Sequence, residues 1–220
     1  MNTTLLELTN QVLVSIREEP VIDLTSPYAS LIASLVNDAV YQVEAAHDWS
    51  ALFVEFIETI LSDEEVILSG RGDRIKIDYI VSNTSNLELI KRTRRWMTSE
   101  FIKNGALYGT PSSWCNKGVS QAGATAGDAT IQLDRVPLSG PETITIVGWQ
   151  RSPRLTADSD TILVPATPVR DLAIALAVRE RGEADSQTAQ EYFVIAKRTL
   201  ADAISFDSAR NDDEDVWYAV

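Results

Sequence analysis

Cysteine and histidine are almost absent from this sequence of 220 residues, which contains only Cys115 and His47. A single cysteine cannot form an intramolecular disulfide, and these two residues cannot supply a Cys- or His-rich metal site. Long apolar runs are also missing, because no stretch approaches the ~18 apolar residues of a membrane-spanning helix. No basic region precedes an apolar one at the start, so we expect no signal peptide and folding in a reducing cytoplasm. We therefore expect no metal, no cofactor and no membrane partner.

Positive charge is scarce, since 19 lysines and arginines stand against 32 aspartates and glutamates, for a formal net charge of −13. A protein that coats nucleic acid needs a basic face that neutralises phosphates. The charge balance argues against such a protein. It is compatible with a protein that lets DNA slide past.

One basic cluster stands out against this acidic background: Lys91, Arg92, Arg94 and Arg95 precede Trp96. As a short nucleic-acid contact, it would use the tryptophan to stack on a base. As a plain surface feature, it would be a strand edge or helix start made soluble by charge. As a protein contact, it would bind an acidic partner, because arginine pairs bidentately with carboxylates. The sequence leaves these three interpretations open.

Candidate catalytic residues are few, because a nucleophile needs a base beside it. His47 lies at the end of an amphipathic helical pattern, where histidine commonly caps or packs. Cys115 follows Trp114 and is interpreted as a small buried hydrophobe. The acidic clusters at residues 63–65 and at 158 and 160 lie in predicted turns. We expect no catalytic, cofactor-binding or metal-binding residues, and therefore no enzyme.

Helical periodicity marks both ends of the sequence, and alternating apolar residues mark its middle. Thr4 and Glu7 have the spacing of a capping box, and Ser26 is the expected cap of a second helix. Thr167 is the expected cap of a third helix, and a fourth follows it. The short strands between these pairs are interrupted by glycine and proline, which is typical of a small sandwich or barrel.

Four helices with one apolar stripe each need mutual cover. The predicted fold class is therefore α+β, with a four-helix bundle formed by the N- and C-terminal helix pairs and a central antiparallel β sandwich or barrel inserted. The bundle comprises residues 1–48 and 165–206, the β domain 49–164, and a C-terminal docking tail 207–220. The residues expected to be buried in the bundle are Leu31, Leu35, Leu172, Leu176, Phe193 and Leu200.

The segment from Asn10 to Val21, Asn-Gln-Val-Leu-Val-Ser-Ile-Arg-Glu-Glu-Pro-Val, resembles the head-to-tail adaptors of short-tailed phages, the tail tubular protein A family. In that family a helix ends in Ser-Ile/Leu-Gly-Glu-x-Pro-Val, a second long helix follows, and a tryptophan stands where the β domain begins. Arg17 stands where the family usually has glycine. The residues that match this N-terminal pattern are Ser15, Ile16, Glu18, Pro20, Val21 and Trp49. A second stretch, 148–161, resembles the end of the β region in phage connector proteins.

The resemblance implies a virion structural protein that forms a homo-oligomeric ring, expected to be a dodecamer. Such a ring joins the portal protein to the tail nozzle protein and lines the channel through which DNA is ejected without specific binding. It would be assembled in the host cytoplasm and located in the tail or neck of the virion, and tail fibres are a further partner to consider. The alternatives are a tail-associated hydrolase or carbohydrate-binding component built on the β region, or a DNA-binding factor that uses residues 91–95.

The C-terminal residues combine an acid run, 212–215, with an apolar and aromatic segment, 216–220. A solvated tail would expose the apolar area of two large aromatic rings, whereas aromatic residues are favoured binding anchors. We expect the tail to leave its own subunit and dock on the portal or on an adjacent copy, with Trp217 as anchor. A tail folded back on its own bundle is the alternative. The residues expected to make the contact are Trp217, Tyr218, Val220, Asp213 and Glu214.

Overall fold

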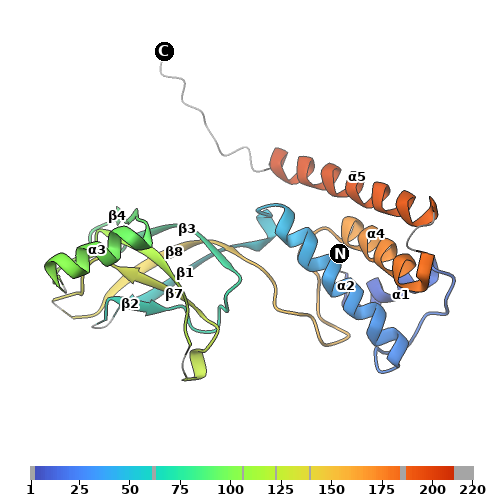
Figure 1. Ribbon diagram of the computed structural model, residues 1–220, viewed down its shortest axis with the longest axis horizontal. Coiled ribbons are helices and arrows are strands. Elements are labelled where there is room, and N and C mark those ends of the chain that lie inside the picture. The colour runs from blue at the N-terminus through green and yellow to red at the C-terminus, as the bar shows by residue number, and fades with distance from the viewer. Residues whose placement is uncertain are drawn as a thin grey trace, which may run out of the picture. The chain divides into compact units, whose positions relative to one another are not determined.

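The computed structural model describes residues 3–60, 63–105, 107–121, 123–138, 140–183 and 187–210 (Figure 1). The fold is α+β and divides into two units. The helical unit is formed by Met1–Leu52 and Ser152–Val220, and the β unit by Phe53–Arg151. The β region is thus inserted between two helical parts of the chain.

The predicted end of the β domain at residue 164 needs correction, because residues 152–164 belong to the helical unit. Hydrogen bonds to distant residues hold this segment there. The side chain of Asn37 donates to the Leu155 carbonyl at 3.1 Å and accepts from the Leu155 N–H at 2.9 Å. The Ile162 N–H donates to the Thr3 carbonyl at 3.0 Å. These contacts join residues far apart in the sequence, so local patterns could not place the boundary.

The helical unit contains α1 (Leu5–Ser15), α2 (Pro27–Ala46), α4 (Ala166–Val178) and α5 (Gln187–Arg210), with short helical turns η1 (Ser50–Leu52) and η3 (Arg179–Glu183). The predicted capping box of α1 is confirmed, since Thr4 and Glu7 each accept the other's backbone N–H. Ser26 caps α2 as predicted. Thr167 does not cap its helix, because α4 already begins at Ala166.

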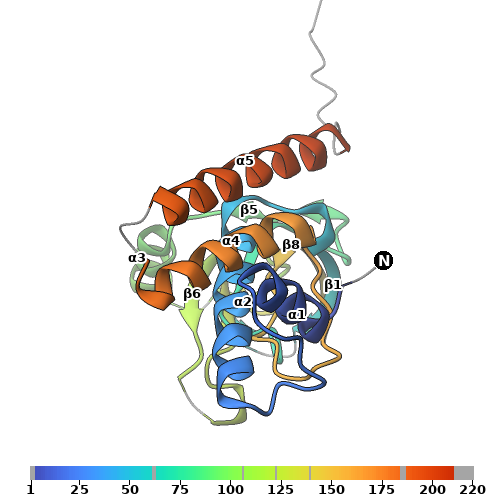
Figure 2. The ribbon, with the colours of Figure 1, turned by 90° about the vertical axis from the view of Figure 1, so that its right-hand side faces the viewer.

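Helices α1, α2 and α4 pack against one another, whereas α5 packs mainly along α4 (Figure 2). Both ends of the chain therefore contribute to one unit. Leu176 is buried as predicted, but Leu31 is 40% exposed, so that prediction is wrong. Leu35, Leu172, Phe193 and Leu200 are only half-buried. Ile32, the neighbour of Leu31, is buried in its place, and the apolar side chains that α2 buries are Ala29, Ile32, Ala33, Val36, Ala39, Val40 and Val43.

The end of α1 places Arg17 in the left-handed backbone region, with φ of 64°. The N–H groups of Arg17 and Glu18 donate to the carbonyls of Val14 at 3.0 Å and Leu13 at 2.9 Å, which is the Schellman pattern. Glycine suits this position because it has no Cβ. This explains why glycine would be favoured at the position of Arg17, as it is in the adaptor family that the sequence resembles. The left-handed conformation of Arg17 costs about 1–2 kcal/mol of backbone strain.

Side chains also fix the segment that follows α1. Asn10 donates to the Val21 carbonyl at 2.9 Å and accepts from the Val21 N–H at 2.8 Å. Arg181 of η3 donates to the Ile16 carbonyl at 2.7 Å and forms an ion pair with Glu18. The residues of the Asn10–Val21 stretch thus have a structural role, which is to end α1 and to hold the next segment against the unit.

The β unit contains two four-stranded sheets, which do not close into a barrel. One has the order β1-β8-β3-β4 and the other β2-β7-β6-β5, and every pair is antiparallel except β5 with β6. Helix α3 (Arg94–Asn104) packs on β6, and η2 (Gly123–Thr125) is a short turn. The strands are β1 (Phe53–Ile60), β2 (Glu65–Ile67), β3 (Ile75–Ser82), β4 (Leu87–Glu88), β5 (Ile90–Lys91), β6 (Ser113–Val119), β7 (Ala129–Leu133) and β8 (Glu142–Gln150).

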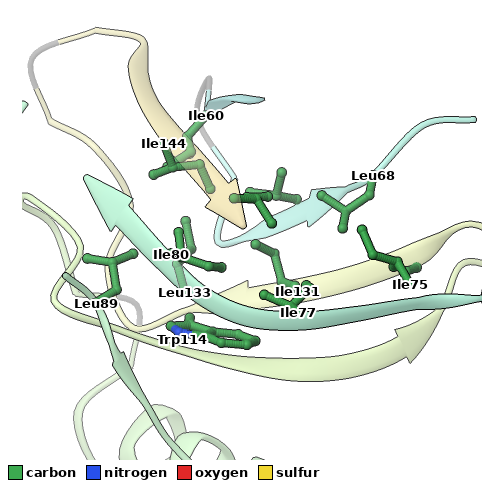
Figure 3. Packing of buried hydrophobic residues seen from close by; sticks show 13 residues of the cluster. Ile60, Leu68, Ile75, Ile77, Ile80, Leu89, Trp114, Ile131, Leu133 and Ile144 are labelled. Atoms are coloured by element: carbon green, nitrogen blue, oxygen red, sulfur yellow. The ribbon is translucent and has the colours of Figure 1, made fainter. Parts of the chain in front are cut away.

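One apolar core joins the two sheets (Figure 3). Ile80 and Ile144 from one sheet and Trp114 and Ile131 from the other are at most 1% exposed. Gly148 sets the contact between β8 and β3, because a Cβ added there would lie 2.2 Å from the Lys76 carbonyl oxygen. The interpretation as a barrel is wrong, because the strands form two separate sheets that pack on this shared core.

Candidate functional site

The basic cluster begins at the end of β5 and continues into the first turn of α3. Lys91 already has partners inside the β unit. Its Nζ donates to the Ile77 carbonyl at 3.1 Å and lies 5.0 Å from the centre of the Trp114 ring. Since β3 and β6 belong to different sheets, this lysine helps to join the two sheets.

The three arginines of the cluster are exposed. The Arg92 guanidinium lies 4.9 Å from the centre of the Trp96 ring, so it already makes a cation–π contact within the cluster. Arg94 and Arg95 stand in the first turn of α3, where the helix dipole adds to their positive charge. The arrangement can bind a carboxylate or phosphate group, which agrees with either of the two binding interpretations.

Cys115 lies on β6 and is buried, as predicted. Burial raises the pKa of its thiol, and the nearby positive charge of Arg94 offsets this only in part. The thiolate is the nucleophilic form of cysteine. Cys115 therefore carries no sign of a reactive thiol.

A polar cluster in the helical unit joins His47, Ser50 and Asp207. The Ser50 hydroxyl donates to Asp207 Oδ1 at 2.6 Å, and the Ser50 N–H donates to Oδ2 at 3.0 Å. His47 Nε2 lies 3.3 Å from Asp207 Oδ2. Burial raises the pKa of Asp207, but the two Ser50 hydrogen bonds and the histidine together outweigh it, so the pKa is lowered overall.

The order of these three groups matters for their chemistry. In a catalytic triad the histidine lies between serine and aspartate, because it must take the serine proton. Here Asp207 lies between the other two and itself accepts the hydrogen bond from the Ser50 hydroxyl, so the histidine does not contact the serine. The cluster therefore fastens the C-terminal part of α5 to the end of α2, and the structural role expected for His47 fits this geometry.

A groove of 1120 Å³ lies between α1 and α4, and most of the residues that line it have polar side chains. Its carboxylates are engaged: Glu7 belongs to the capping box, and Asp171 accepts from Arg170 at 2.8 Å. Across the part of the chain that the structure describes, no three His, Cys, Asp or Glu side chains are grouped to hold a metal ion.

A second groove, of 350 Å³, lies between α2, α4 and α5 and is mostly apolar. Sequence analysis did not find it, because its walls come from three helices. We call it the α5 groove. It is lined by Gln42, Val43, Pro168, Leu172, Phe193, Ala196, Lys197 and Leu200.

Two helices also keep apolar side chains on their outward faces. Val194 and Phe206 on α5 are 67% and 68% exposed. Tyr28, Leu31 and Tyr41 are exposed on α2. A signal for this exists in the sequence, since Phe193, Val194 and Ile195 are consecutive and cannot all face one side of a helix.

The five tail residues predicted to dock on a partner, Trp217, Tyr218, Val220, Asp213 and Glu214, lie outside the described residues, so their role stays a prediction. Among the helices described, none is long and apolar enough to cross a membrane. No protein-family model matches the sequence, and no curated protein matches it either.

Proposed function

We propose that this chain is a structural adaptor subunit, which forms a ring with copies of itself between a phage portal and a tail nozzle. The observation that carries the proposal is the pair of exposed apolar faces on α2 and α5. Apolar surface of this kind marks interaction sites. Two different faces on one chain suit a head-to-tail contact, and such contacts close into rings when the rotation between copies allows it.

We also propose that α1, α2, α4 and α5 form a complete four-helix bundle only in the assembled ring. Along its length α5 contacts mainly α4, which leaves much of its surface uncovered within one chain. In the ring, a neighbouring copy covers the outward face of α5. The bundle is thus completed by assembly.

Charge supports a channel that does not retain DNA. The chain has a net charge of −13, and an acidic wall repels phosphates over the ~8–10 Å of the screening length. Arg94 and Arg95, repeated by the ring symmetry, form an isolated basic ring. The C-terminal segment with Trp217 supplies the anchor for the portal.

Native mass spectrometry of the purified chain, alone and mixed with the portal protein from the same source, tests the proposal. We expect a closed ring of twelve copies, at least when the portal is present. The double variant Ile195→Asp, Phe206→Asp places charge on one exposed face of α5, since both side chains are exposed and eleven residues apart on the helix, and it should prevent assembly. A matched control, Val119→Asp, changes an exposed valine of the β unit. A monomer that stays monomeric and does not bind the portal would contradict the proposal.

A further inference from the structure

The α5 groove is an apolar recess beneath a helix, although protein interiors are normally close-packed. Its volume of 350 Å³ lies within the ~300–1,000 Å³ range of ligand pockets. The rings and chains of Phe193 and Leu200 remain half-buried along it. The groove therefore offers apolar contact area that its own three helices do not cover.

Two positive charges lie at the groove, on Lys197 and Arg179. Lys197 lines it and has no ion-pair partner among the residues that the structure describes. The Arg179 guanidinium lies 5.8 Å from the centre of the Phe193 ring. No carboxylate stands among the lining side chains. In so acidic a chain, a groove of this kind favours a ligand that combines negative charge with a large apolar side chain.

The chain itself contains such a segment, since residues 212–218 read Asp-Asp-Glu-Asp-Val-Trp-Tyr. We propose that the α5 groove binds this segment of the same chain, with the Trp217 ring inserted between α2 and α5 near Leu200 and Asp215, the last residue of the acid run, closest to Lys197. An aromatic side chain can bury ~150–250 Å² in such a contact.

The chain is long enough to make this contact. Leu200 lies ten residues before the end of α5 at Arg210, a distance of about 15 Å at 1.5 Å per helical residue. The seven residues from Arg210 to Trp217 span up to ~23 Å when extended. Asn211 follows the helix directly, and asparagine tolerates the left-handed conformation that reverses the chain at helix ends.

Binding within one chain also has a concentration advantage, because a short tether keeps the segment at an effective concentration of order mM. The contact does not rest on the proposed ring, since groove and segment belong to the same subunit. In an assembled adaptor the partner would have to draw Trp217 out of the groove, so the contact would mask the docking segment until assembly.

The test uses a fluorescent peptide of residues 211–220 and full-length chains. In the variant Trp217→Ala the groove is open to the peptide, whereas in the wild type it is occupied. We expect the variant to bind the peptide at least tenfold more tightly than the wild type. Adding Ala196→Trp, which fills the groove, should abolish binding. Adding Val194→Trp on the exposed face of α5 is the matched control and should leave binding unchanged.

Circular dichroism confirms that each variant is folded before the titration. Equal affinity of wild type and Trp217→Ala, or no binding to either, would overturn the proposal. Binding that Ala196→Trp leaves unchanged would place the peptide elsewhere and overturn it too. Sedimentation velocity of the wild type should show a monomer at the concentrations used. A dimer that Trp217→Ala dissociates would assign the groove to the tail of a second copy and contradict the intramolecular contact. The peptide titration does not need an assembled ring, so the groove contact can be tested even if the chain forms no ring.

Discussion

Strand β7 and helix α5 show how differently the two units hold their elements. β7 has five residues, lies between β2 and β6, and buries four of its side chains. α5 has 24 residues, yet among its described side chains only Ala189, Ala196 and Asp207 are buried. The β unit thus supplies its own core. The last helix of the helical unit buries few of its described side chains and leaves apolar side chains such as Val194 and Phe206 exposed.

The largest difference between the two elements should appear on truncation of one apolar side chain in each. Ile131→Ala in β7 removes a fully buried side chain and should lower the free energy of unfolding by ~2–5 kcal/mol. Val194→Ala in α5 should change it by less than ~0.5 kcal/mol. Urea unfolding followed by circular dichroism measures both. Similar losses at the two positions would contradict the comparison.

Close packing of the β unit can be tested at Gly148. In Gly148→Ala the new Cβ would lie 2.2 Å from a backbone oxygen, so β3 and β8 must separate. We expect a loss of about 3 kcal/mol in the free energy of unfolding. Gly118→Ala has nothing within 4 Å of the added Cβ and is the control for space, although its φ of 119° adds backbone strain. If Gly118→Ala cost more than Gly148→Ala, the close approach of the strands would not limit this position.

The attachment of α5 depends on Asp207. Asp207→Asn weakens the bonds to Ser50 and the attraction to His47, and should cost ~1–3 kcal/mol. The exposed Asp202→Asn on the same helix is the matched control. Thermal unfolding of the two variants checks this, and equal melting temperatures would show that the cluster does not fasten α5.

The same cluster predicts a pH dependence. Because the folded-state pKa of Asp207 is lowered, its contribution is fully present above the unfolded value of ~3.9 and is lost as pH falls through the folded value. The stability difference between wild type and Asp207→Asn should therefore shrink as the pH falls below about 4. A difference that grows as the pH falls from 4 to 2 would have the wrong sign.

The smallest expected effect is a gain. Arg17→Gly relieves the left-handed backbone at the end of α1 and should raise the free energy of unfolding by ~0.5–1 kcal/mol. Loss of the Arg17 side chain removes no interaction shown for it. Chemical denaturation measures the gain, and a destabilised variant would show that the arginine has a contact of its own.

The sequence could predict those features that depend on neighbouring residues. The capping box at Thr4 and Glu7, the cap at Ser26 and the burial of Cys115 are examples. The burial of Leu31 was wrongly predicted because Leu31 and Ile32 are both apolar, and periodicity alone cannot choose between adjacent residues. The bonds between Ser50 and Asp207 join residues 157 positions apart, and the α5 groove needs three helices. No local pattern encodes such contacts.

The adaptor proposal makes α5 a helix that gains its missing contacts from a neighbour, and amide hydrogen exchange can follow this directly. Exchange should be measured peptide by peptide in the free chain and in the chain mixed with portal protein. The account predicts that α5 amides exchange much faster than β7 amides in the free chain and become strongly protected in the mixture, while β7 amides do not change. Unchanged exchange of α5 in a mixture that contains the assembled complex would contradict it.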